Sequence, residues 1–137
     1  LQLAELHNIR EELHALFLTL ANGAEPSRTL LRPLNARLRS AVAARELGGS
    51  RGRVRWTWRA VESDPQRLTG EILLSAADLL TSGAFAKVRQ CDGDGCGWLF
   101  LDRSPAGHRR WCSMADCGNK AKARRHYAQR VSPRASP

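Results

Sequence analysis

The chain has 137 residues, 42% of them hydrophobic and 26% charged, which fits one globular domain with or without a small appendage. We expect neither a membrane protein nor a signal peptide, because no apolar run approaches roughly 20 residues and no basic segment precedes an apolar one at the start. The formal net charge is +9, and residues 1–82 contain 11 Lys or Arg and 9 Asp or Glu, whereas residues 83–137 contain 11 and 4. The localised excess predicts a polyanionic partner, nucleic acid before a membrane.

Two amphipathic helices are predicted at the start of the chain. Apolar residues recur every three or four positions over residues 3–20, and Ala21-Asn22-Gly23 provides a helix stop. A second helix opens at Pro26-Ser27 and ends at Gly48-Gly49-Ser50, and it tolerates Pro33 only in its first turn because a later proline removes a backbone hydrogen bond. Its apolar stripe comprises Leu30, Leu31, Leu34, Leu38 and Val42.

Alternating apolar and polar side chains over residues 54–60 predict a strand. The glycines before it are compatible with a hairpin whose arms are Glu46-Leu47 and Arg53-Val54. The side chains assigned to the buried side of the strand are Val54, Trp56, Trp58 and Ala60.

A third helix is predicted to begin at Asp64-Pro65, an N-cap followed by proline at the first helical position, and to end near Gly83. The resulting fold class is mainly α with small β elements. We expect a helical N-terminal domain with a short strand or hairpin over residues 1–83, a metal-binding module over residues 84–130, and a flexible, polar tail over residues 131–137.

The four cysteines of the chain form two matched pairs. Four residues separate Cys91 from Cys96, four separate Cys112 from Cys117, and fifteen lie between the pairs. Two chelating turns joined by such a spacer suit tetrahedral zinc. Disulfides are disfavoured because nothing indicates secretion, and the spacing matches neither common ferredoxin pattern, although four thiolates can hold an iron–sulfur cluster. We predict one structural Zn²⁺ bound by all four cysteines, with His108 as the reserve ligand.

A module of roughly 40 residues buries too little apolar surface to fold alone, so metal binding is expected to supply the missing free energy. We predict a hairpin of Trp98–Leu101 with Arg109–Trp111, and then a helix that Ser113 caps and that runs through Tyr127. Two ligands before a hairpin and two at a helix start make a treble-clef-like zinc finger. Trp98 and Trp111 are assigned to its core.

Residues 91–127 closely resemble the CGNR zinc finger. The matching positions are Cys91, Cys96, Gly97-Trp98, Phe100-Leu101-Asp102, Arg109–Met114 and Cys117-Gly118-Asn119-Lys120. The family has Arg where this chain has Lys120, which keeps the charge but loses the guanidinium fork. The resemblance implies zinc at the four cysteines, and DNA binding.

The preceding region resembles, in its architecture and in Leu34-Asn35, the helical ABATE domain of bacterial proteins that are proposed as stress-induced transcription regulators. In such proteins we expect additional residues N-terminal to this region, which begins at Leu1 in the sequence given. The resemblance implies a regulator of bacterial origin.

Basic residues near the metal site are the candidate nucleic-acid contacts. With six to ten phosphate contacts, affinity would fall roughly a thousandfold or more between 50 and 200 mM salt. On a helical wheel the basic residues of the last helix do not share one face, so Arg109 and Arg110 are expected to share the contact surface. The candidates are Arg109, Arg110, Lys120, Lys122, Arg124, Arg125 and Arg130. Asn119 is expected to bond the backbone of the metal site instead.

We predict a cytoplasmic DNA-binding transcription regulator, associated with the nucleoid when bound, whose N-terminal domain senses a small-molecule effector or forms a homodimer. One alternative is an RNA-binding module that adds Trp98, Phe100 and Trp111 to the same charge, and another is a zinc-stabilised protein-interaction module. An enzyme is not expected, because a four-cysteine zinc site has no open position and the sequence offers no nucleophile–base pair.

Overall fold

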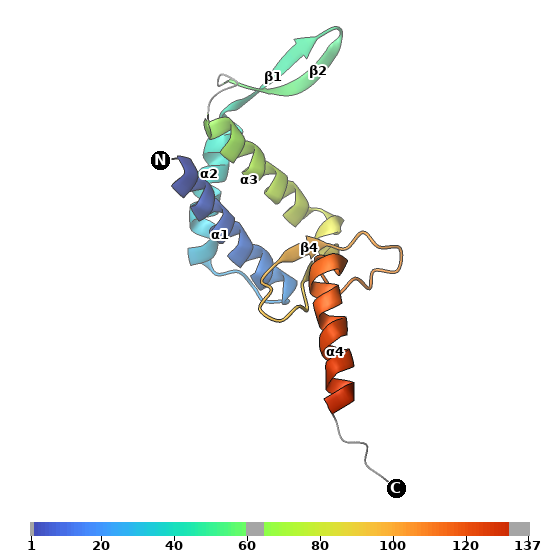
Figure 1. The fold of residues 1–137 in the computed structure, drawn as a ribbon. Coiled ribbons are helices and arrows are strands. Elements are labelled where there is room, and N and C mark those ends of the chain that lie inside the picture. Colours follow the sequence, from blue (N-terminus) through green and yellow to red (C-terminus); the bar gives the residue numbers. More distant parts are fainter. Residues whose placement is uncertain (1, 60–64, 132–137) are drawn as a thin grey trace. The chain divides into compact units, whose positions relative to one another are not determined.

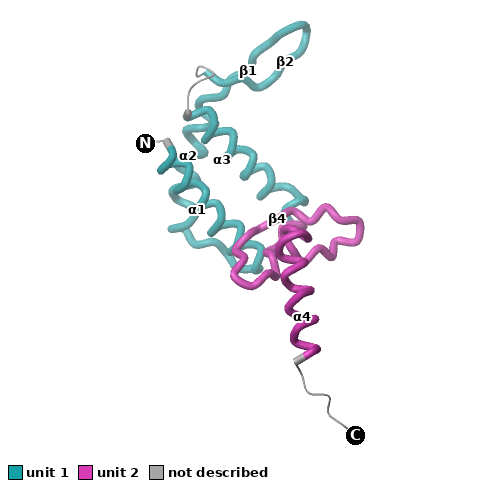
Figure 2. The backbone as a smooth tube through the Cα atoms, viewed as in Figure 1, with its two compact units in different colours: residues 1–85 teal, residues 86–137 magenta. Residues whose placement is uncertain are grey.

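The computed structural model describes residues 2–59 and 65–131 (Figure 1). The chain divides into two compact units, Leu1–Phe85 and Ala86–Pro137 (Figure 2). The first unit contains α1 (Gln2–Ala21), α2 (Arg28–Ala43), β1 (Arg45–Ser50), β2 (Arg53–Trp58) and α3 (Pro65–Thr81). The second contains β3 (Val88–Gln90), β4 (Leu99–Leu101), the π-helical turn η2 (Met114–Gly118) and α4 (Asn119–Val131), and the 3-10 helix η1 (Gly83–Lys87) includes the boundary. The predicted class, mainly α with small β elements, is confirmed.

The core of the first unit lies between its three helices. Each helix contributes apolar side chains that the other two exclude from water, and this burial is the main source of stability for the unit. Arg37 of α2 also reaches across to α1, where it forms ion pairs of 3.3 Å with both Glu5 and Glu12. The buried core residues are Ile9, Leu16, Leu34 and Leu73.

The predicted signals between the first two helices are confirmed. Gly23 has a φ of +73°, the left-handed conformation that ends a helix and that glycine adopts without strain. Ser27 is the N-cap of α2, and its Oγ accepts a hydrogen bond of 3.2 Å from the Leu30 amide.

Two expectations for α2 are wrong. The helix ends at Ala43, and the predicted stop, Gly48-Gly49-Ser50, instead forms the end of β1. Pro33 lies inside the helix, beyond its first turn. The Thr29 carbonyl therefore lacks the amide partner that an ordinary residue at position 33 would supply. The packing of the leucines on either side of Pro33 offsets this loss.

The predicted hairpin is confirmed. Strands β1 and β2 are antiparallel, with Arg45 opposite Trp58 and Ser50 opposite Arg53. The connecting residues Arg51 and Gly52 have φ values of 50° and 75°. Positive φ at both central residues is the signature of the tight turn that matches the twist of a two-stranded ribbon.

The predicted buried side of β2 is wrong. Val54 and Trp56 are 72% and 60% exposed. Only the base of the hairpin is covered, because Trp58 packs on α3 so closely that a Cβ on Gly70 would lie 2.5 Å from its ring. Alternation correctly places these residues on one face but does not tell whether another element covers that face. Ala60 is outside the described residues.

Helix α3 begins at Pro65 as predicted, while Asp64 falls outside the described residues. The apolar stripe predicted for α2 is wrong at its last residue, where α2 and α3 approach each other closely. Ala41 is buried, whereas Val42 is 58% exposed. The Ala41 Cβ would lie 3.4 Å from a Cβ on Gly70, so the two small residues face each other where the helices meet.

The predicted strand partner in the second unit is wrong. Strand β4 pairs with β3, with Val88 opposite Leu101 and Gln90 opposite Leu99, and residues 109–111 form no strand. The first cysteine pair therefore lies in the loop of the β3–β4 hairpin. This loop is closed by a 2.9 Å bond from the Cys91 amide to the Trp98 carbonyl.

Candidate metal centre

The four cysteines converge on one point. Their Sγ atoms all lie within 4.8 Å of one another, with 3.7 Å between Cys96 and Cys112 and 3.8 Å between Cys112 and Cys117. A tetrahedron with Zn–S bonds of about 2.3 Å has edges of about 3.8 Å, whereas a disulfide has an S–S length of about 2.05 Å. The thiols are free and are spaced for a single tetrahedral ion.

The first chelating loop is a tight turn that follows β3. The Cys96 amide donates a hydrogen bond of 2.9 Å to the Gly93 carbonyl. Gly95 inside this turn has a φ of +67°, which favours glycine. Gly93 is needed for a different reason, because a Cβ there would lie 2.9 Å from the Cys117 Sγ.

The second chelating loop is the start of the last helix. Ser113 caps it as predicted, and its Oγ accepts a hydrogen bond of 3.2 Å from the Asp116 amide. The Gly118 amide donates to the Ser113 carbonyl at 3.1 Å. This bond spans five residues, so the first turn is π-helical. The turn places the Cys117 Sγ 3.8 Å from the Cys112 Sγ. The predicted helix through Tyr127 is confirmed as α4.

Backbone amides stabilise negative charge on Cys91. Its Sγ accepts hydrogen bonds from the amides of Gly93 at 3.4 Å and Cys112 at 3.3 Å. Burial raises the pKa of Cys91, but these bonds and those from the Cys112 and Cys96 thiols outweigh it and lower the pKa to about 7. A hydrogen bond with Cys96, and then burial, raise the pKa of Cys117 to about 12. A divalent cation removes this conflict because it replaces the protons that the crowded thiols share.

The centre therefore fits one structural zinc ion, with all four thiols available and no fifth group in the cluster. The four cysteines are the only members of this cluster among the described residues, and His108 lies in an exposed loop away from it. The expected bond from the Asn119 side chain to the backbone of the metal site is present, at 3.1 Å to the Ala115 carbonyl.

Arg109 braces the second chelating loop. Its Nε donates a bond of 2.8 Å to the Trp111 carbonyl, and its Nη2 donates to the Cys112 carbonyl. The guanidinium also lies 4.7 Å from the centroid of the Phe100 ring, within the range of a cation–π contact. These contacts occupy a side chain that the sequence places among the nucleic-acid contacts.

Asp102 has a structural role that the sequence analysis missed. It is 3% exposed and accepts bonds from the Ser104 hydroxyl at 2.6 Å, the Ser104 amide at 2.9 Å and the Arg109 amide at 3.0 Å. The Ser104 bonds, with the Arg109 amide, hold the pKa of Asp102 below its usual value. The carboxylate thus closes the loop between β4 and the second cysteine pair. Aspartate two residues before a serine is the recognisable signal of such a turn.

Two more of the basic candidates are paired with acidic residues of the first chelating loop. Arg110 forms an ion pair of 2.7 Å with Asp92, and Arg124 pairs with Asp94. The other four side chains are exposed and have no hydrogen-bond or ion-pair partner within the described parts of the chain. They are Lys120, Lys122, Arg125 and Arg130.

The assignment of Trp98 to the core of the finger is wrong. Trp98 is 72% exposed, whereas Trp111 is partly buried beneath the Arg110 guanidinium, which lies 5.2 Å from its ring centroid. Trp98 lies between the first chelating loop and β4, and it lines a groove with Lys120 and Arg124 of α4 without being covered by them. Among the described residues of the finger, the buried side chains are instead Val88, Cys91 and Asp102.

Comparison with known families divides the chain in the same place. Residues 1–83 match the ABATE family, whose description is "Putative stress-induced transcription regulator", and residues 87–130 match the CGNR zinc finger. No match was found among curated proteins. Within the described parts of the chain, no helix combines the length and apolar character that crossing a membrane requires. The chain belongs to the ABATE family and carries a CGNR zinc finger after the ABATE domain.

Proposed function

We propose that the protein is a DNA-binding transcription regulator whose zinc finger presents α4 to the phosphate backbone. Membership of the ABATE family supports the regulatory role. The observation that carries DNA binding is the charge of α4, which has five Lys or Arg and no acidic residue among 13 residues. All residues from 122 to 130 are exposed, so the finger itself does not cover this helix.

The cations of α4 repel one another in the free protein. Lys120 and Arg124 are four residues apart and Lys122 and Arg125 are three apart, spacings at which like charges destabilise a helix by about 0.2–0.5 kcal/mol per pair. Asp94 neutralises only Arg124. A helix that is polar all round needs a partner, and phosphate groups would supply the missing negative charge.

Three of the four unpartnered cations lie on one side of α4. At about 100° per residue, Lys122, Arg125 and Arg130 fall within the same half of the helix. Lys120 and Arg124 fall on the opposite side, where they line a groove of about 510 Å³ with the first chelating loop. The side with Lys122 is therefore the proposed DNA contact.

The protein as a whole is proposed to be a regulator and not an enzyme. The role is one of binding and not of catalysis, which four cysteines around one ion support because they leave no open coordination position. The protein would act in the cytoplasm, on the nucleoid, and its ABATE domain would sense an effector or form a homodimer.

The test is fluorescence anisotropy of a labelled DNA duplex titrated with zinc-loaded protein at several salt concentrations. With three phosphate contacts, the slope of log affinity against log salt is about −2.7, so affinity falls about fortyfold between 50 and 200 mM salt. A protein that binds no duplex, random or genomic, at 50 mM salt would refute the proposal.

Single-stranded RNA is the second candidate, and the exposed aromatic rings favour it. Trp98 and Tyr127 are both 72% exposed, and unstacked bases bind to such rings. Competition between duplex DNA and single-stranded RNA for the zinc-loaded protein separates the two. If RNA is the ligand, Trp98→Ala weakens RNA binding by about tenfold or more and leaves duplex binding unchanged.

A further inference from the structure

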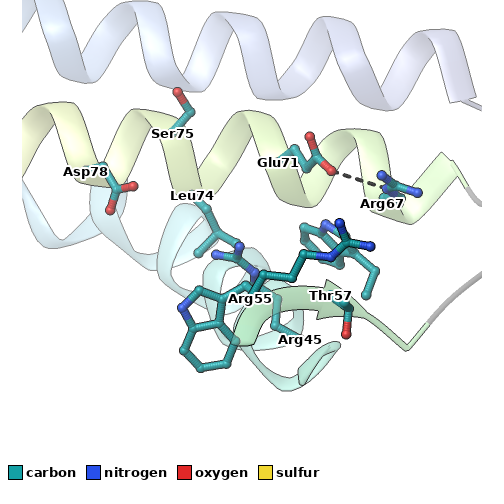
Figure 3. A pocket seen from close by; sticks show the side chains of 10 residues that line it. Arg45, Arg55, Thr57, Arg67, Glu71, Leu74, Ser75 and Asp78 are labelled. Atoms are coloured by element: carbon teal, nitrogen blue, oxygen red, sulfur yellow. Dashed lines mark hydrogen bonds and ion pairs between the residues drawn. The ribbon is translucent and has the colours of Figure 1, made fainter. Parts of the chain in front are cut away.

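We infer that the first unit holds a binding site for a small aromatic carboxylate, in a groove of about 720 Å³ between the β1–β2 hairpin and α3 (Figure 3). The hairpin contributes Arg45, Trp56 and Trp58 to one wall. The facing wall is one side of α3, where lining residues recur over residues 67–78 at three- and four-residue spacing. This groove lies entirely within one compact unit.

Arg45 is held between two indole rings. It stands opposite Trp58 in the sheet register and on the same face as Trp56, because side chains two residues apart on a strand share a face. Its guanidinium carbon lies 5.3 Å from the Trp56 ring centroid and 5.6 Å from that of Trp58. The flat cation is therefore fixed in orientation by contacts that leave its hydrogen-bonding edge without a partner.

The Nε of Arg45 is buried and has no hydrogen-bond partner within the described parts of the chain. A buried donor without an acceptor costs about 1–3 kcal/mol, so a ligand oxygen that reached Nε when the indole rings move apart would relieve this cost. The two terminal nitrogens of Arg45 are not among the buried atoms, and the end of a guanidinium can bind both oxygens of a carboxylate in the same plane. Arg45 is thus the proposed anchor of the ligand.

The charges around the groove fit a single negative charge. Arg55 adds a second guanidinium to the hairpin wall, while on α3 Arg67 pairs with Glu71 at 3.2 Å and Asp78 lies further along. Three guanidiniums and two carboxylates leave a net charge of +1. This favours a monoanion over a phosphate dianion, which the two carboxylates would repel.

The apolar part of the lining selects the body of the ligand. Trp56, which is 60% exposed, offers an aromatic surface on the hairpin, and Leu74 offers an aliphatic surface on α3. Aromatic rings prefer to stack on such faces, which adds about 0.5–1.5 kcal/mol to the burial of area. A carboxylate attached to a planar ring therefore satisfies both the charge and the lining.

This inference gives the effector sensing in the proposed function a ligand class, and it is tested without DNA so that the two can fail separately. The zinc-loaded protein is titrated with 1-naphthoate, with the neutral 1-naphthamide and with inorganic phosphate, and binding is followed by calorimetry and by ¹H–¹⁵N NMR. We expect naphthoate to bind at least about tenfold more tightly than either control compound. The indole N–H signals of Trp56 and Trp58 shift, and those of Trp98 and Trp111 do not.

The matched variants are Arg45→Gln in the groove and Arg39→Gln, an exposed position of α2 outside it. Arg45→Gln lowers naphthoate affinity by about tenfold or more, and Arg39→Gln leaves it unchanged. If Arg45→Gln does not fold, Arg55→Gln serves in its place and weakens binding in the same direction. Equal binding of naphthoate and naphthamide, no binding of naphthoate, or wild-type affinity in these groove variants would overturn the inference.

Discussion

Gly93 lies against one cysteine of each pair. An added Cβ would lie 2.9 Å from the Cys117 Sγ and 3.3 Å from the Cys96 Cβ, and neither thiol can retreat without leaving the metal. Overpacking of this kind costs about 1–3 kcal/mol, so Gly93→Ala is expected to weaken zinc binding by about tenfold. The measurement is competition with a chromophoric chelator. Gly97→Ala is the control, because no atom lies within 4 Å of its added Cβ, and an equal loss there would contradict this account.

Asp102 makes a second prediction at the residue scale. In Asp102→Asn the new NH₂ group meets the Arg109 or Ser104 amide, donor against donor, which costs about 1–3 kcal/mol. We expect amide exchange at Ser104 and Arg109 to accelerate by about tenfold, measured by NMR on the zinc-loaded protein. Asp116→Asn, an exposed carboxylate of the same finger, should leave these rates unchanged.

The pH dependence of this contribution follows from the lowered pKa of Asp102. A carboxylate with a depressed pKa in the folded state stabilises the protein fully above its unfolded pKa of about 3.9, and that stabilisation is lost as pH falls through the folded value. The effect of Asp102→Asn on amide exchange, corrected for intrinsic rates, is therefore the same at pH 6 and pH 8. An effect that changed between these pH values would contradict the assignment.

At the scale of the elements, the β1–β2 hairpin contacts α3 where Trp58 packs on Gly70, and this contact shapes the groove. Gly70→Ala gains about 1 kcal/mol of helix propensity but forces the Trp58 ring to move, and overpacking costs about 1–3 kcal/mol. The net result is a loss of up to about 2 kcal/mol of unfolding free energy in urea. In a Trp58→Leu background the ring is gone and Gly70→Ala should stabilise by about 1 kcal/mol. The same sign in both backgrounds would show that the two residues do not touch.

The basic residues of the zinc finger are predicted to divide into those of α4 that bind phosphate and Arg109, which stabilises the second chelating loop. Lys122→Gln and Arg125→Gln should each reduce the salt slope of DNA affinity by about 1, because each removes one phosphate contact. Arg109→Gln should leave the slope unchanged and weaken zinc binding instead, because it removes bonds to the Trp111 and Cys112 carbonyls. Identical slope changes in all three variants would refute this division of roles.

At the scale of the whole molecule, the metal site could be predicted from the sequence more reliably than the exposure of the side chains around it. Matched spacing alone brings Cys91, Cys96, Cys112 and Cys117 together, since two short turns must converge on one ion. Strand β3 was not predictable, because three residues are too few to show a period. The exposure of Trp56 and Trp98 was not predictable either, since alternation identifies a face and not what covers it.

The same limit applies to charge. The sequence marks seven basic candidates equally, and only the folded chain distinguishes Arg109, which bonds backbone carbonyls, from Lys122, whose side chain has no hydrogen-bond or ion-pair partner among the described residues. Lys120, where the family has Arg, is also exposed and unpaired among the described residues, so no contact within the finger requires a guanidinium fork there. Which hydrogen bonds a long basic side chain makes depends on the backbone carbonyls that folding brings close to it.

The central claim is that one zinc ion holds the second unit together and thereby presents α4. Its most direct test is a chelator titration followed by ¹H–¹⁵N and methyl NMR together with metal analysis. We expect one zinc per chain to be released, α4 and the β3–β4 hairpin to lose their dispersed signals, and the methyl signals of Ile9, Leu16 and Leu73 to persist because their core contains no metal ligand. A protein without bound zinc, or a second unit that stays folded after the metal is removed, would contradict the account.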